Sequence, residues 1–151
     1  MNASIVLVCD TGNHKLRAID AAGRVTRFAG GGASGVSSGS SDGLASSVAL
    51  FTSPTGVAVD TATRVVWVTD GDRVRRIAGG SVTTVTAAAA VFFSLMGISI
   101  DANSTAFVAD MGANTVGVVF CATPWNTGVD NSGNPLAATT DFHWRVTLSR
   151  S

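Results

Sequence analysis

Three aspartates are the residues whose type and spacing most suggest chemistry. Asp10, Asp70 and Asp110 each end an apolar run and precede a turn that contains glycine. A carboxylate there can coordinate a metal ion, or it can accept hydrogen bonds from backbone N–H groups two or three residues ahead. Because the three recur at one place in a repeated pattern, we favour the structural role. Asp60 and Asp101, which end two further runs, are interpreted in the same way.

The two histidines do not form a metal site with these acids. His14 follows Asp10 in its turn, and His143 lies beside Trp144 near the other end of the chain. A zinc site normally needs three or four converging ligands, and two distant histidines do not supply them. No nucleophile elbow and no Cys–His pairing accompanies them. We therefore predict no metal, no cofactor, no catalytic residue and no enzymatic activity, and we expect His14 to pack or hydrogen-bond between neighbouring repeats.

Clustered arginines give the only candidates for binding. Arg73, Arg75 and Arg76 follow Arg64 closely, and alternation along a strand would place Arg73 and Arg75 on one face with Arg76 opposite. Such a patch could meet phosphate, but no aromatic platform adjoins it. We predict a solvated face, with Arg73, Arg75 and Arg76 as weak binding candidates and the true binding residues unknown.

Two polar stretches resemble ligand loops only superficially. The glycine-rich stretch at residues 30–35 lacks the Lys-Ser/Thr ending of a phosphate loop, so we predict a flexible surface loop. Residues 130–134 have the composition of a calcium loop without its spacing or closing glutamate, and they predict a turn.

Composition narrows the classes of partner. The chain has 151 residues, the length of one domain, and a formal net charge of zero, which argues against nucleic acid and anionic membranes as partners. Charged residues make up 13%, about half of the usual share, which suggests that a partner or further sequence covers some surface. The most apolar segment, residues 87–100, is too short to span a membrane, and we interpret it as a buried strand with its approach loop.

Cysteines and sequons leave the compartment open. Cys9 lies in an apolar run and predicts a buried free thiol, while Cys121 has no partner at metal-ligand spacing. Sequons at Asn2 and Asn103 permit an extracellular or cell-surface setting, although no signal-peptide pattern is visible.

The elements that hold these residues repeat about every forty positions. The run that ends at Asp60 returns forty-one positions later, and the run that ends at Asp70 returns forty positions later. One complete unit contains four short strands, predicted at residues 56–60, 65–69, 73–77 and 81–86. A period near forty built from short strands is typical of a β-propeller blade, a sheet of four antiparallel strands.

The chain therefore predicts an all-β fold of about 2.5–3 blades. The units cover residues 5–28, 54–86 and 95–121, and the first of them lacks its opening strand. Residues 122–151 predict a loop-rich tail with a final strand near 142–148. Closed propellers use four to eight blades. We therefore expect a fragment of a larger protein, or self-association of copies that completes the propeller.

The turns of these units resemble the NHL-repeat family. Asp10, Gly12, Asn13 and His14 match the family's Asp-x-Gly-Asn-His turn, and residues 30–60 resemble its segment between blades. The turns that follow Asp70 and Asp110 lack the histidine, so no role of a repeated histidine carries over to them. The resemblance covers about residues 5–120.

The resemblance implies a six-bladed propeller. Members of this family serve mainly as binding platforms for proteins, RNA or glycans, and a related minority are lyases and lactonases with metal ions in the central channel. We expect a non-enzymatic binding or scaffold module for an unknown protein or glycan. The alternative is part of a metal-dependent propeller enzyme, of lyase or lactonase type, whose site lies on missing blades.

Overall fold

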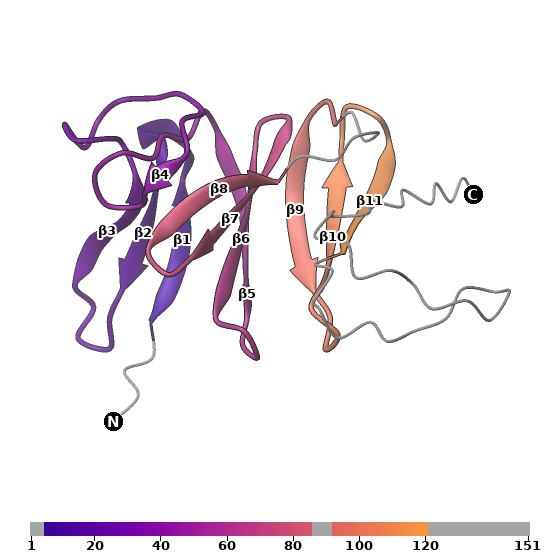
Figure 1. The fold of residues 1–151 in the computed structure, drawn as a ribbon, viewed down its shortest axis with the longest axis horizontal. Helices are drawn as coiled ribbons and strands as arrows, with labels where there is room; N and C mark the ends of the chain where they lie inside the picture. The colour runs from indigo at the N-terminus through magenta and orange to yellow at the C-terminus, as the bar shows by residue number, and fades with distance from the viewer. Residues whose placement is uncertain (1–4, 86–91, 121–151) are drawn as a thin grey trace, which may run out of the picture.

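A computed structural model describes residues 5–85 and 92–120, which form three antiparallel β-sheets (Figure 1). The first sheet contains β1 (Val6–Asp10), β2 (Lys15–Ile19) and β3 (Val25–Gly30), with a 3-10 turn, η1 (Thr11–Asn13), after β1. The second sheet runs in the order β5 (Pro54–Asp60), β6 (Val65–Asp70), β7 (Arg73–Ala78), β8 (Ser81–Val85) and β4 (Gly43–Leu44). The third contains β9 (Leu95–Ile100), β10 (Thr105–Asp110) and β11 (Thr115–Phe120). The prediction of an all-β fold is confirmed, and none of the three sheets closes on itself.

The strands form where apolar runs are separated by turn residues. The link between β2 and β3 shows the local cause. Asp20 accepts hydrogen bonds at its Oδ1 from the N–H groups of Ala22 and Arg24, and Gly23 takes a left-handed φ of 78°. The four strands predicted at residues 56–60, 65–69, 73–77 and 81–86 agree with the bounds of β5 to β8 to within two residues.

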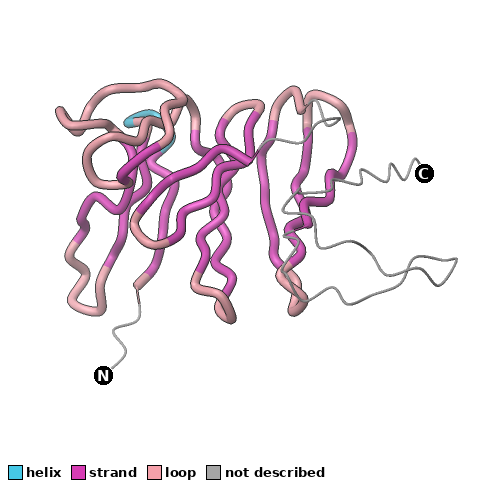
Figure 2. The backbone as a smooth tube through the Cα atoms, viewed as in Figure 1, coloured by secondary structure: helices cyan, strands magenta, loops and turns pink. Residues whose placement is uncertain are grey.

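The three sheets stand side by side and bury two apolar layers between them (Figure 2). The layer between the first and second sheets contains Leu16, Phe51 and Val68, and the layer between the second and third contains Trp67, Leu95 and Val108. Each residue of β6 is buried because β6 is an interior strand, paired with β5 and β7, and has an apolar layer on either face. The second sheet is therefore the centre of the described fold.

The second and third sheets make their closest approach at β5 and β9. The Thr69 hydroxyl donates to the carbonyl of Met96 at 2.9 Å and accepts from the N–H of Gly56 at 2.8 Å. A Cβ atom built on Gly56 would lie 2.6 Å from the Met96 carbonyl oxygen, so the approach requires glycine at this position.

The prediction that residues 30–35 form a flexible surface loop is wrong for residues 30–32, whereas Ala33 and Ser34 are exposed as predicted. Gly30, Gly31 and Gly32 are buried, and the Lys15 ammonium donates to the carbonyl of Gly35 at 2.5 Å. Further along this connection Ala45, Ala49 and Phe51 insert into the first apolar layer. Their burial holds the connection against the sheets.

The number of strands in the second sheet also differs from prediction. The connection contributes β4, which pairs with the start of β8, so β8 is not the edge strand of this sheet over that length. The second sheet thus has five strands rather than four, and the first and third have three each in the described ranges. The predicted turn at residues 130–134, the predicted strand near 142–148 and Cys121 lie outside the described residues.

Candidate functional site

Asp70 ties the end of β6 to the segment that leads into β5. One carboxylate oxygen accepts hydrogen bonds from two consecutive N–H groups, those of Thr52 at 2.8 Å and Ser53 at 2.6 Å. In return the N–H of Gly71 donates to the Ser53 carbonyl at 3.2 Å. We call this arrangement the carboxylate clasp: an aspartate at a strand end, two consecutive N–H donors, and one return bond from the next residue. It fixes where the neighbouring strand begins.

Arg75 adds an ion pair with Asp70 to the clasp of the second sheet. Its guanidinium is fully buried and donates to the second oxygen of Asp70 at 2.9 Å, to Asp42 at 2.9 Å, and to the carbonyls of Ser41 and Leu50. It also lies over the ring of Phe51, 5.2 Å from the centroid. Burial would raise the pKa of Asp42, but hydrogen bonds from Thr84 and Arg75 hold it below its ordinary value.

The prediction of a solvated arginine face is therefore wrong for Arg75. The guanidinium of Arg75 is removed from solvent because it packs against Phe51, and its burial is tolerated because Asp42 and Asp70 neutralise its charge. Arg73 remains 42% exposed and lies 3.7 Å from Asp72, and Arg76 is half-buried. The three arginines do not form one surface.

Asp110 forms the same clasp in the third sheet. It accepts hydrogen bonds from the consecutive N–H groups of Phe93 and Ser94 at 3.0 and 2.9 Å, and the Met111 N–H returns a bond to the Ser94 carbonyl at 2.8 Å. It also accepts from Gly112 and Ala113 in the following turn, as the sequence predicts. Burial would raise the pKa of Asp110, but these four backbone donors lower it below its ordinary value.

Asp10 occupies the equivalent position in the first sheet but holds no such segment among the described residues. Its carboxylate accepts from the Asn13 amide at 2.7 Å and from the Arg17 guanidinium at 2.9 Å. The Asn13 hydrogen bond, followed by the Arg17 hydrogen bond, lowers the pKa of Asp10. The prediction that Asp10 and Asp70 accept from the turn backbone is wrong, because side chains and a distant segment supply their donors. For Asp60 and Asp101 it is confirmed.

His14 connects the first and second repeats, as the sequence predicts. Its Nδ1 lies 2.6 Å from the carbonyl oxygen of Thr52, and the neighbouring Thr11 hydroxyl donates to the carbonyl of Pro54 at 2.6 Å. Both contacts reach the segment that Asp70 holds, so His14 and Asp70 fasten the same stretch of chain from two sheets.

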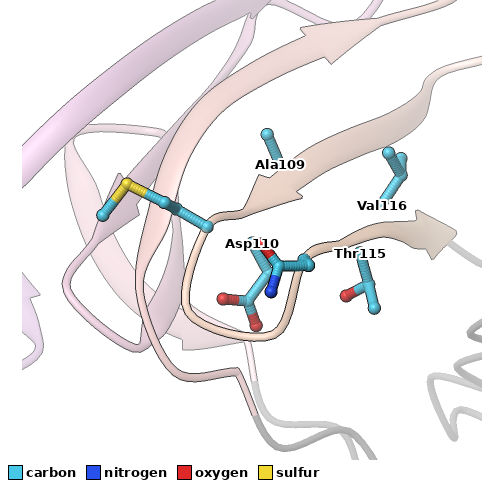
Figure 3. A pocket seen from close by; sticks show the side chains of 6 residues that line it. Ala109, Asp110, Thr115 and Val116 are labelled. Atoms are coloured by element: carbon cyan, nitrogen blue, oxygen red, sulfur yellow. The ribbon is translucent and has the colours of Figure 1, made fainter.

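A shallow pocket of about 250 Å³ lies at the turn between β10 and β11 (Figure 3). It is lined by Ala109, Asp110, Met111, Asn114, Thr115 and Val116. The Asp110 carboxylate is already occupied by backbone donors, so the polar groups left for a ligand are Asn114 and Thr115. Met111 is 62% exposed and Val116 54%, which adds apolar surface beside them. A second cavity, about 300 Å³, lies between the first and second sheets near Phe28 and Arg64.

The next features are metal ligands and the Cys9 thiol. Among residues 5–85 and 92–120, no group of three or more His, Cys, Asp and Glu side chains could hold a metal ion. Burial, with a smaller contribution from the charge of Asp70, raises the pKa of the Cys9 thiol to about 11. Cys9 is a free, half-buried thiol. No helix in these ranges is long and apolar enough to cross a membrane.

The fold and clasps define an all-β protein of repeated antiparallel sheets, and this fold can be compared with known proteins. No protein-family model matches the chain, and no curated protein matches it. Among solved structures, it is similar to an auxiliary nutrient binding protein from Bacteroides thetaiotaomicron, with a TM-score of 0.57 and 17% sequence identity. The match covers 78% of this chain and 35% of that chain, so the sequence spans about a third of its structural neighbour. At this identity the likeness shows the fold alone.

Proposed function

We propose that the chain forms blades of an NHL-type β-propeller and acts as a non-enzymatic binding or scaffold module for a protein or a glycan. The repetition of the carboxylate clasp carries this proposal. Asp70 and Asp110 end the equivalent strands of successive sheets, and each accepts from two consecutive backbone N–H groups, which supports sheets that are copies of one unit. Copies set side by side around a common axis are the plan of a propeller.

The turn ends are the surface that we assign to the ligand. The pocket at the β10–β11 turn combines an exposed amide, a hydroxyl and exposed apolar side chains, from Asn114, Thr115 and Met111. A few polar groups on an apolar background suit a neutral sugar or peptide segment. The structural neighbour is described as a nutrient binding protein, which agrees with a ligand-binding role for this kind of fold.

A ligand screen with a matched pair of variants tests the proposal. The 151-residue chain would be titrated, by NMR or calorimetry, with a panel of neutral oligosaccharides and extended peptides. For any ligand that binds, Asn114→Gly should weaken binding roughly tenfold, because it deletes a polar contact while tolerating the left-handed φ of 54°. Asn103→Gly, at the opposite end of the same sheet, is the control and should leave affinity unchanged.

Two results would contradict the proposal. Equal weakening by both variants would remove the β10–β11 turn as the binding surface. Stoichiometric zinc or calcium in the purified chain, with a hydrolytic or lyase activity lost on chelation, would favour the metal-dependent propeller enzyme instead.

A further inference from the structure

We propose that the edge of β1 that faces away from β2 binds an extended peptide strand whose sequence resembles residues 51–60. Asp10 would hold this peptide by accepting hydrogen bonds from two of its consecutive backbone N–H groups. This inference rests on the comparison of the three sheets and is independent of the ligand proposed above.

The two clasped sheets define what belongs at this edge. β5 pairs with β6 so that Val57 lies opposite Val68, and β9 pairs with β10 so that Ile98 lies opposite Val108. β1 is the strand of the first sheet that is equivalent to β6 and β10, and one of its edges pairs with β2. Within the described residues, no strand pairs with the other edge of β1. An unpaired edge exposes a row of N–H and C=O groups that can accept an added strand.

The clasp at this edge is already half built. Arg17 lies opposite Val8 as Arg75 lies opposite Val68, so the two arginines are equivalent in register. Each donates to its aspartate at 2.9 Å. The Asp10 and Arg17 side chains remain 26% and 32% exposed, whereas Asp70 and Arg75 are fully buried. The missing part is the segment whose backbone would cover the pair.

The completed clasps specify the chemistry of the occupant. In both, an aromatic residue, Phe51 or Phe92, comes first, and the two donors that follow end in a serine, Ser53 or Ser94. The strand then continues through a glycine into an alternating apolar stretch that ends in aspartate. Bound antiparallel to β1, such a segment would place its aromatic ring over Arg17, as Phe51 lies over Arg75.

The backbone of β1 offers the remaining contacts. The return bond of each clasp comes from the residue after the aspartate, Gly71 or Met111, and the equivalent N–H belongs to Thr11. Val6 and Val8, 62% and 40% exposed, lie on the face of β1 away from Leu7 and Cys9, which pack on the second sheet. An added strand would cover part of this apolar surface.

A peptide titration tests the site directly. A fluorescent synthetic peptide of residues 51–60 would be titrated with the 151-residue chain and followed by anisotropy, with a scrambled peptide of equal composition as control. Saturable binding is expected for the native peptide alone. The same peptide methylated at the nitrogens of Thr52 and Ser53 should bind roughly tenfold more weakly or worse, because it cannot donate to Asp10.

Protein variants locate the bound peptide. Asp10→Asn should weaken binding roughly tenfold, because a charged acceptor is lost. Asp72→Asn, the same change on the exposed turn of the second sheet, should leave binding unchanged. The methylated peptide keeps the test valid if Asp10→Asn alters folding, which circular dichroism would reveal.

The proposal would be overturned by absence of saturable binding, by equal binding of the native and methylated peptides, or by equal weakening by Asp10→Asn and Asp72→Asn. Dimerisation that blocks peptide binding would also overturn it and assign the edge to a second copy of the chain.

Discussion

In the second sheet Asp70 and Arg75 are fully buried, whereas the equivalent Asp10 and Arg17 of the first sheet keep 26% and 32% of their side chains exposed. The acid, the arginine, their cross-strand register and their distance of 2.9 Å are the same in both. The burial therefore comes from the segment that precedes β5, not from the ion pair. An ion pair covered in this way becomes essential to the fold, since neither charge can be left alone in the interior.

The third sheet shows that the clasp does not require the arginine. Gly117 lies opposite Val108, where Arg75 lies opposite Val68. A Cβ on Gly117 would lie 2.7 Å from the Phe92 ring, so the aromatic residue fills the space of the missing side chain. Asp110 instead takes two further N–H donors from its own turn. The feature that the two clasps share is the carboxylate with its two consecutive backbone donors.

Removing each aspartate in turn should break this comparison most sharply. Asp70→Ala leaves Arg75 buried with one acid fewer and leaves two N–H groups unpaired, so we expect a loss of about 3–5 kcal/mol in the free energy of unfolding. Asp10→Ala should change it far less, because solvent reaches Arg17 and no backbone donor depends on Asp10. Urea unfolding of both variants measures the difference, and equal losses would contradict the account.

The glycines at the start of β5 and β9 provide the next contrast. Gly56→Ala should cost about 1–3 kcal/mol, since its Cβ would collide with the Met96 carbonyl. Gly97 is the equivalent residue of β9 and has no atom within 4 Å of a built Cβ. Gly97→Ala should therefore be neutral or slightly stabilising. Thermal unfolding checks the pair; a similar loss in both variants would mean that the close approach of β5 to β9 is not what requires glycine.

Lowering the pH should reveal a smaller contrast between Asp110 and Asp10 in what each contributes to the stability of the fold. The pKa of Asp110 is lowered on folding, so its stabilising effect is complete above the unfolded pKa of about 4 and disappears as the pH falls through the folded pKa. The stability gap between the wild type and Asp110→Asn should therefore narrow between pH 6 and pH 3. The corresponding gap for Asp10→Asn should be small throughout. A gap for Asp110→Asn that stays constant over this range would be the contrary result.

Cys9 gives the smallest effect, on the face of β1 that the second sheet covers. With the thiol pKa raised to about 11, alkylation of Cys9 at pH 8 should be on the order of 100-fold slower than in the urea-unfolded chain. Mass spectrometry of the Cys9 peptide would measure the rate. Equal rates in the folded and unfolded chain would mean that β1 does not pack on the second sheet.

The strands could be predicted from the sequence because their signals are local. Apolar runs ending in Asp60, Asp70 and Asp110, with turns between them, place the strands that contain them to within two residues. The role of His14 could also be predicted, because its place in the repeated turn indicates a contact with the neighbouring repeat, and its Nδ1 contacts the carbonyl oxygen of Thr52.

The clasps could not be predicted because they join residues far apart in sequence. Asp70 accepts from residues seventeen and eighteen positions earlier, and Arg75 is buried by a connection that reads as a flexible loop. Polar composition around residues 30–42 concealed the burial of Phe51 downstream. A usable signal did exist: an aromatic residue and a serine two positions later precede both Asp70 and Asp110 at nearly equal distance.

Hydrogen exchange at single amides tests the clasp most directly. In the wild type, the N–H groups of Thr52, Ser53, Phe93 and Ser94 should be protected. Asp70→Asn should speed exchange at Thr52 and Ser53 while Phe93 and Ser94 stay protected, and Asp10→Asn should leave all four unchanged. Unchanged protection at Thr52 and Ser53 in Asp70→Asn, or an equal loss in Asp10→Asn, would contradict the account.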